Sequence, residues 1–173
     1  MSVERVAAFL RAAGGEARLE EFGKGTPTAA EAAEAAGCEL AQIVKSLVLV
    51  CDGVPVVALV PGDRRGDTGK VARALGAGTV RVATGDEVES ATGFAPGAVA
   101  PFPLPKVRTI YLDRTLLRHP RVWVGGGSEN HLVSLAPAEL ARLTRAQSMD
   151  VVQAEPYHSP GHLGGDPPEQ KER

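Results

Sequence analysis

The chain has 173 residues, of which 43% are hydrophobic and 23% charged, and its formal net charge is -2 at pH 7. A chain of this length can bury about 70% of its unfolded surface, so a single domain needs neither disulfides nor a structural metal. The small negative charge argues against extended binding to DNA or another polyanion, although local patches such as Arg64-Arg65 could still contact phosphates.

Cysteine use and hydropathy predict the compartment. Cys38 and Cys51 are 13 positions apart, which matches no zinc or redox spacing, and we expect both to be reduced thiols. The N-terminus lacks a basic segment followed by an apolar core, and no apolar run reaches the roughly 20 residues that a membrane helix needs. We therefore expect a cytoplasmic protein with no membrane partner.

The first part of the chain predicts two helices around a short strand. Ser2 can cap a helix whose apolar residues follow helical spacing from Val3, and Gly14-Gly15 ends this helix. The segment Ala17 to Phe22 alternates enough to form a strand. Thr28-Ala-Ala-Glu31 is a capping box, and the alanine-rich run that follows predicts a helix ending at Gly37.

The most apolar stretch predicts a β-hairpin. Ile43 to Cys51 and Val54 to Val60 flank Asp52-Gly53, a pair that readily adopts the positive φ values of a tight turn. Strand alternation places Lys45 on one face and Ser46 on the other, and both faces are otherwise apolar. Burial of the ammonium must be offset by an anionic partner or by opening onto a cleft, so Lys45 marks a candidate site. The alternative is that Lys45 lies near a strand end and extends to water.

The remainder predicts short helices and strands around one shaped loop. Gly93 to Pro105 holds four prolines and two glycines, which is too rigid and poor in donors for regular structure. Before this loop we expect a polar turn with solvated arginines at Pro61–Gly66, helices at 67–75 and 84–91, the second starting with a capping box, and a strand at 80–83. After it we expect strands at 107–112, 121–124, 131–135 and 149–152, a helical turn at 113–117 and a helix at 137–143.

These elements predict one mixed α/β domain at residues 1–154, with seven to nine short strands and five short helices. Residues 155–173 are polar and rich in Pro and Gly, and we expect a disordered tail. His158 and His162 have the spacing of a metal pair but lie in that tail, so no metal and no cofactor is assigned.

The Gly125 to His131 segment, GGGSENH, is a second candidate site. Its glycines permit an anion-binding nest of backbone N–H groups, although the segment matches neither a P-loop nor a dinucleotide loop, and a flexible hairpin loop is the alternative. His131 could act as an acid or base, but a histidine at a strand start is more often structural. Neither Ser46 nor Ser128 lies in a GxSxG elbow, which argues against a nucleophilic serine.

Three segments occur in a recognisable order: TPTAAEAAEAAGCELAQIVKSLVLV, GFAPGAVAPF and VWVGGGSENHLVSL. In order and spacing they resemble the YbaK/prolyl-tRNA-synthetase-associated editing domain family, over roughly Ala17 to Val152. The resemblance implies a mixed α/β fold whose curved, partly barrel-like mixed sheet is surrounded by short helices. It also implies a deacylase of mischarged aminoacyl-tRNA, most often tRNA for proline carrying a small non-cognate amino acid such as Ala, Cys, Ser or Thr.

The resemblance also implies roles for individual residues. Lys45 would contact the 3′-terminal aminoacyl-adenosine, and Ser46 would tune selectivity. The loop that holds the ester carbonyl would contain Gly93, Pro96 and Gly97, and the second wall of the pocket would contain Gly125, Gly126, Gly127, Ser128 and His131. Backbone N–H groups near Gly97 or Gly126 would stabilise the oxyanion, while His131 or the substrate's ribose hydroxyl activates water.

The implied partners are the acceptor end of an aminoacyl-tRNA and an aminoacyl-tRNA synthetase that lends affinity. Two other functions remain open at this point. One is a non-catalytic module that binds aminoacyl-tRNA or a synthetase. The other is a small-molecule hydrolase or nucleotide binder that uses the GGGS loop.

Overall fold

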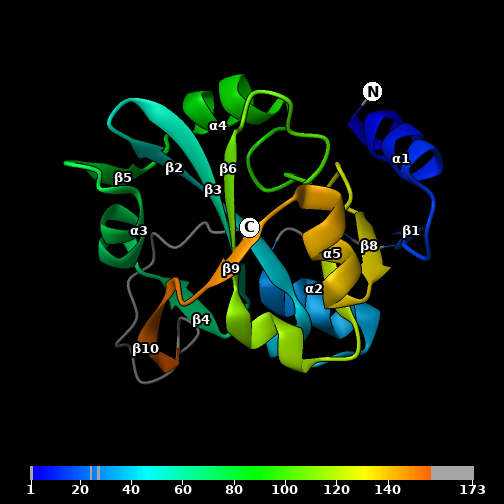
Figure 1. The fold of residues 1–173 in the computed structure, drawn as a ribbon. Coiled ribbons are helices and arrows are strands. Elements are labelled where there is room, and N and C mark those ends of the chain that lie inside the picture. The colour runs from blue at the N-terminus through cyan, green and yellow to red at the C-terminus, as the bar shows by residue number, and fades with distance from the viewer. Residues whose placement is uncertain (1, 24, 27, 157–173) are drawn as a thin grey trace.

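Five α-helices and ten β-strands form a mixed α/β domain in a computed structural model that describes residues 2–23, 25–26 and 28–156 (Figure 1). The helices are α1 (Ser2–Ala13), α2 (Ala29–Ala36), α3 (Thr68–Leu75), α4 (Gly85–Thr92) and α5 (Pro137–Thr144). The strands are β1 (Arg18–Glu21), β2 (Val44–Cys51), β3 (Val54–Pro61), β4 (Arg64–Gly66), β5 (Val80–Val82), β6 (Thr109–Asp113), β7 (Val122–Gly125), β8 (His131–Leu135), β9 (Gln147–Met149) and β10 (Val152–Pro156). Two 3-10 helices cover Leu40–Gln42 and Arg114–Arg118. The predicted fold class and the five helices are confirmed.

The strands form three separate sheets. A five-stranded mixed sheet has the order β5-β2-β3-β6-β9, with β2 and β3 antiparallel and β3, β6 and β9 parallel. The antiparallel sheet β1-β8-β7 adjoins it through a bridge between Ile43 and Trp123, and β4 pairs with β10. None of these described sheets closes on itself, so the partly barrel-like sheet is not confirmed. The five-stranded sheet ends in the three-residue edge strands β5 and β9, which do not pair with each other.

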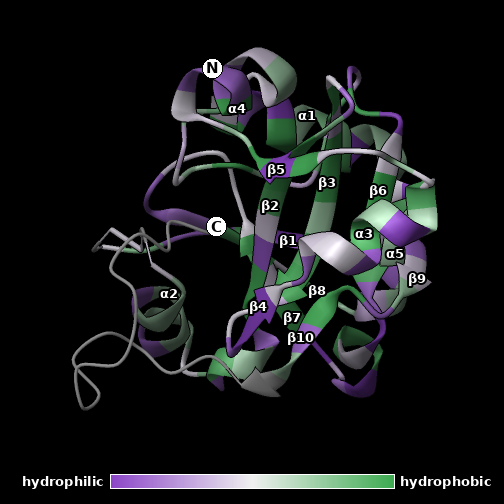
Figure 2. Ribbon diagram, turned by 90° about the vertical axis from the view of Figure 1, so that its left-hand side faces the viewer, coloured by the Kyte–Doolittle hydropathy of each residue, from purple (hydrophilic) through white to green (hydrophobic). Residues whose placement is uncertain are grey.

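The central hairpin is confirmed. Asp52 and Gly53 have φ values of 48° and 82°, the two positive values that a two-residue hairpin turn needs. The register runs from Val44 opposite Pro61 to Cys51 opposite Val54. The strands at the centre of the molecule are largely hydrophobic, and residues 44–48 are buried (Figure 2). Both faces of β2 are therefore covered, as expected.

The predicted helix starts at Thr28 and Thr84 are also confirmed. Each threonine side chain accepts a hydrogen bond from the backbone N–H three residues later, and the glutamate there bonds back to the threonine N–H. Both helices end at a left-handed glycine, Gly37 or Gly93.

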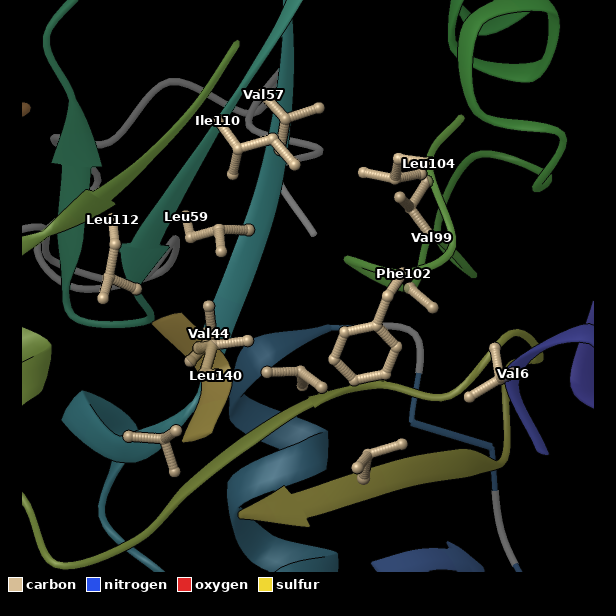
Figure 3. Close-up of a cluster of buried hydrophobic side chains, with 14 of the residues drawn as sticks. Val6, Val44, Val57, Leu59, Val99, Phe102, Leu104, Ile110, Leu112 and Leu140 are labelled. Atoms are coloured by element: carbon tan, nitrogen blue, oxygen red, sulfur yellow. The ribbon is translucent and has the colours of Figure 1, made fainter. Parts of the chain in front are cut away.

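The main core lies between the two larger sheets and is closed by α1, α5 and the predicted loop Gly93–Pro105, called here the proline loop. Val99, Phe102 and Leu104 of this loop share one cluster with Val6 of α1 and Val44 of β2 (Figure 3). A second cluster, on the opposite face of the five-stranded sheet, includes Val71 of α3. The proline loop is thus an anchored part of the core, although it has no regular structure.

Two local predictions are wrong in detail. Within Pro61–Gly66, residues 64–66 form strand β4, and Arg64 is half-buried rather than solvated, with its Nη2 donating to the Ala154 carbonyl over 3.1 Å. The strand expected at Met149–Val152 is divided into β9 and β10, because the Val151 N–H turns away to donate to Asp113 Oδ1 over 3.0 Å. Both errors arise from pairing between segments far apart in the sequence.

The end of the chain is described only in part. Strand β10 continues through Glu155 and Pro156, the first two residues of the expected tail. Residues 157–173, with His158 and His162, lie outside the described residues. Across the part of the chain that is described, no helix combines the length and the apolar character needed to cross a membrane.

Candidate active site

Lys45 is buried beneath strand β4. The residue is only 5% exposed, and it lies on the face of β2 that carries Leu47 and Leu49 into the second cluster. Its Nζ donates to the backbone carbonyl oxygen of Arg64 over 2.7 Å. Strand β4 lies close to this face, since a Cβ at Gly66 would come within 2.5 Å of Leu47 Cδ2. The alternative in which Lys45 extends to water is therefore wrong.

Ser46 lies on the other face of β2 and is 2% exposed. Its Oγ is buried and has no hydrogen-bond partner among the described residues. Leaving a buried hydroxyl unpaired costs about 1 to 3 kcal/mol. A polar group of a ligand that reached this hydroxyl would recover part of that cost.

The backbone of Ser46 faces an edge of β2 that β3 does not use. The Ile43 carbonyl accepts from Gly62 on the β3 side, whereas the Val48 carbonyl accepts from Ala83 on the opposite side. Because backbone groups alternate along a strand, Ser46 turns its N–H and C=O toward the same edge as Val48. Strand β7 approaches this edge in parallel through the Ile43–Trp123 bridge.

The glycines at the end of β7 and in the turn to β8 are buried, and they are needed for close packing. A Cβ at Gly125 would overlap the carbonyl oxygen of Val99 in the proline loop, and a Cβ at Gly127, which has φ +100°, would lie 2.9 Å from the Ser2 carbonyl oxygen. The Gly126 N–H donates to the His131 carbonyl over 2.9 Å. This donor is thus already engaged, which weighs against Gly126 as the oxyanion donor.

His131 is half-buried and forms a small hydrogen-bonded unit with Ser128 and Asn130. Ser128 Oγ lies 2.6 Å from His131 Nδ1 and donates to Asn130 Oδ1 over 2.7 Å, and the Asn130 N–H donates back to Ser128 Oγ over 3.2 Å. When the serine hydroxyl gives its one hydrogen to Asn130, Nδ1 of His131 is the donor to Ser128, and in that tautomer Nε2 carries no hydrogen.

The proline loop contributes one backbone turn with an available donor. Gly93 is the left-handed cap of α4, and its N–H donates to Glu89 over 2.8 Å. Pro96 is exposed, and the next turn is closed by a hydrogen bond from Ala98 to Ala95 over 3.0 Å. Gly97 is half-exposed with φ +84°, and its N–H has no acceptor among the described residues. Of the two glycines predicted as oxyanion donors, Gly97 is therefore the one whose N–H is not already bonded within the described residues.

The structure brings the three predicted segments together, but it does not direct all their side chains to one side. The proline loop lies on Gly125, and β7 lies beside β2. Ser46 faces the main core, whereas Lys45 leaves β2 on the opposite face. No local sequence pattern predicts that the Val99 carbonyl lies against Gly125 or that the Arg64 carbonyl accepts from Lys45. Asn130 could have been identified from its place beside His131.

The cysteines do not add a reactive group. Burial raises the pKa of the Cys51 thiol, and the nearby Asp52 carboxylate raises it further, as expected for an inert thiol. Cys38 is also a free thiol. In the described ranges, no three His, Cys, Asp or Glu residues group together as a metal site would require.

Comparison with known proteins identifies the family. The family model for the aminoacyl-tRNA editing domain matches residues 24–143. The proposed Cys-tRNA(Pro)/Cys-tRNA(Cys) deacylase EbsC of Enterococcus faecalis is 30% identical over 129 residues, which cover 74% of this chain and 79% of EbsC. A proline–tRNA ligase of Nitratidesulfovibrio vulgaris is 35% identical over 105 residues, which cover 61% of this chain and 18% of the ligase.

Solved structures agree with this result. The crystal structure of a proposed trans-editing enzyme for prolyl tRNA synthetase matches with a TM-score of 0.83 and 42% sequence identity. The match covers 88% of this chain and 98% of the chain in that crystal structure. The crystal structure of the hypothetical protein APE2540 is 35% identical, with a TM-score of 0.81 and coverage of 86% and 99%. On this evidence, the chain belongs to the family of aminoacyl-tRNA editing domains.

Proposed function

We propose that this chain is a trans-editing deacylase that hydrolyses the ester of mischarged aminoacyl-tRNA, with tRNA for proline carrying Ala, Cys, Ser or Thr as its substrates. The observation that carries the proposal is that the Ser46 face of β2 shares the main core with the proline loop, which in turn lies on Gly125 before His131, while Lys45 is buried on the other face of the same strand. The names of the relatives support the choice of tRNA, since one refers to Cys-tRNA(Pro) and another to prolyl tRNA synthetase.

The proposed reaction needs no covalent enzyme intermediate, because an aminoacyl ester is already activated. Water attacks the ester carbonyl carbon, and the Gly97 N–H donates to the oxyanion that develops. Collapse of the tetrahedral intermediate breaks the bond to the ribose oxygen, which takes up a proton as it leaves. The proton released by water goes to His131 Nε2, which returns it to the leaving ribose oxygen, or to the vicinal ribose hydroxyl, which passes its own proton to that oxygen.

In this proposal the two polar residues of β2 hold different parts of the substrate. The Lys45 ammonium, oriented by the Arg64 carbonyl, positions the 3′-terminal adenosine. The Ser46 hydroxyl, on the side of the proline loop, contacts the aminoacyl group and contributes to selectivity. The shape of a pocket discriminates between amino acids that differ by one methylene by only about 1 to 3 kcal/mol. The Ser46 hydroxyl adds selectivity, because it favours an aminoacyl group that can form a hydrogen bond with it.

Affinity for tRNA is expected to come from few contacts. With a net charge of -2, the chain would grip the acceptor end and not the whole tRNA. An aminoacyl-tRNA synthetase that binds the same tRNA could raise the effective concentration of the ester.

A panel of aminoacylated tRNAs tests this proposal. We expect the purified protein to release amino acid from Ala-, Cys-, Ser- or Thr-tRNA(Pro) at least about 10-fold faster than from Pro-tRNA(Pro), the ratio that pocket shape can supply. A binding module would instead protect the ester, so that release falls below the rate in buffer. A small-molecule hydrolase would cleave amino acid esters that lack the tRNA equally fast. Either of these outcomes would overturn the proposal.

A further inference from the structure

Helix α1 precedes the segment matched by the family model, yet it contacts both loops of the candidate site. In both ribbon views α1 and α4 lie toward the same end of the molecule, and Figure 1 shows the loop that follows α4 between them. The matched segment begins at residue 24, whereas α1 spans Ser2–Ala13. The contacts of α1 therefore concern a part of the chain to which no role has yet been given.

Arg5 of α1 ties the two ends of the proline loop together. Its Nη1 donates to the Gly93 carbonyl over 3.3 Å, and its Nη2 donates to the Pro103 carbonyl over 3.4 Å. The guanidinium carbon also lies 4.8 Å from the centroid of the Phe94 ring, within the range of a cation–π interaction. Because Gly93 caps the C-terminus of α4, the positive charge also complements the dipole of that helix.

Two other residues of α1 complete the attachment. Phe9 stacks on Phe102 of the proline loop, with ring centroids 5.2 Å apart and an interplanar angle of 12°. At the start of α1, the Ser2 carbonyl lies against Gly127 in the glycine turn, where a Cβ would come within 2.9 Å. Helix α1 thus fixes the proline loop and the glycine turn relative to each other.

These anchors leave one turn of the loop exposed. Phe94 and Phe102 are fully buried at its two ends, whereas Pro96 is exposed and Gly97 is half-exposed between them. The turn that presents the Gly97 N–H therefore lies between buried Phe94 on one side and buried Ala98 and Val99 on the other. On the Phe94 side, its position depends on how firmly that end of the loop is fixed.

We infer that Arg5 is a positioning residue, which holds the proline loop so that the Gly97 N–H faces the ester carbonyl. This inference rests on the proposed deacylase function. Binding of the tRNA end would depend little on Arg5, because Arg5 acts on the loop and not on the substrate. Loss of Arg5 should then lower kcat and leave KM nearly unchanged.

The test compares three variants in deacylation of the panel tRNA that the parent cleaves fastest. We expect Arg5→Met, which keeps the length of the side chain but loses its donors and charge, to lower kcat about 10-fold to 100-fold with little change in KM. Arg5→Lys keeps the charge but cannot reach both carbonyls in the same way, and it should restore part of kcat. Arg11→Met, at an exposed position of the same helix, is the matched control and should behave like the parent.

Hydrogen exchange of the free protein gives an independent reading. In Arg5→Met, amides of the proline loop should exchange at least about 10-fold faster, while those of β2 and β3 keep their rates. Parental kcat or parental loop exchange would overturn the inference, as would an equal acceleration in β2 and β3, which would indicate general destabilisation. If the parent deacylates no panel tRNA, the proposed function fails, and loop exchange still decides whether Arg5 holds the loop.

Discussion

At the scale of single residues, β2 buries two neighbouring polar side chains in different ways. The Lys45 ammonium is held by the Arg64 carbonyl under β4, so its charge is partly compensated within the protein. The Ser46 hydroxyl is equally buried but has no partner among the described residues. The hydroxyl therefore costs stability, and the proposed function gives it a partner only when substrate is bound.

Replacement of Ser46 by alanine tests this account of the hydroxyl. We expect Ser46→Ala to raise the free energy of unfolding by about 1 kcal/mol, because the variant no longer desolvates an unpaired hydroxyl. Denaturation in urea measures the change.

Ser134→Ala is the matched control, because Ser134 is also buried but its Oγ accepts from Arg121 over 3.4 Å. This variant should lose about 0.5 to 1.5 kcal/mol. If Ser46→Ala is destabilised as much as Ser134→Ala, the hydroxyl is paired in solution and the account is wrong.

At the scale of elements, the start of α4 joins a capping box to a cross-element ion pair. Glu87 completes the capping box with Thr84. Its carboxylate also accepts one hydrogen bond from each Nη of Arg81 in β5, both over 2.7 Å. The hydrogen bonds from Arg81, followed by the Thr84 N–H, lower the pKa of Glu87 from 4.5 to about 2. One carboxylate thus connects α4 to the edge strand of the five-stranded sheet.

This pKa shift predicts a pH-dependent contribution to stability. A carboxylate whose pKa is lower in the folded state stabilises the fold above its unfolded pKa, and that contribution is lost as the pH falls from about 4.5 toward 2. We therefore expect Glu87→Gln to unfold at lower urea concentration than the parent at pH 7, with the difference shrinking at pH 3.

Glu31→Gln provides the comparison, because Glu31 forms the same kind of box with Thr28 but has no ion pair within the described chain. The difference in the urea concentration of unfolding between the parent and Glu31→Gln should depend less on pH. A difference for Glu87→Gln that stays constant from pH 7 to pH 3 would show that the ion pair contributes nothing.

At the scale of the whole molecule, the sequence predicted what local chemistry controls and missed what distant pairing controls. The hairpin turn at Asp52-Gly53 and the caps at Thr28 and Thr84 follow from a few adjacent residues, and all three are present. Strand β4 and the division into three sheets depend on partners many residues away, such as β10. No local pattern contains that information.

The candidate site divides in the same way. Its three segments could be identified from sequence, because each has a distinctive local pattern and their order resembles a known family. The Arg64 carbonyl beside Lys45, the Val99 carbonyl against Gly125 and the engaged Gly126 N–H all depend on tertiary packing. Only the last of these contacts bears on the proposed oxyanion donor, because it leaves Gly97 as the candidate whose N–H has no acceptor among the described residues.

In the proposed function, the buried Lys45 ammonium serves the deacylation of mischarged tRNA. The most direct measurement is single-turnover hydrolysis of the mischarged tRNA(Pro) that the parent cleaves fastest, by the parent, by Lys45→Met and by Lys106→Met. Methionine keeps an unbranched apolar chain in the buried position, and Lys106 is an exposed lysine that serves as the control. We predict that Lys45→Met loses at least about 100-fold in rate while Lys106→Met retains the parental rate. A Lys45→Met variant that deacylates this tRNA as fast as the parent would contradict the account.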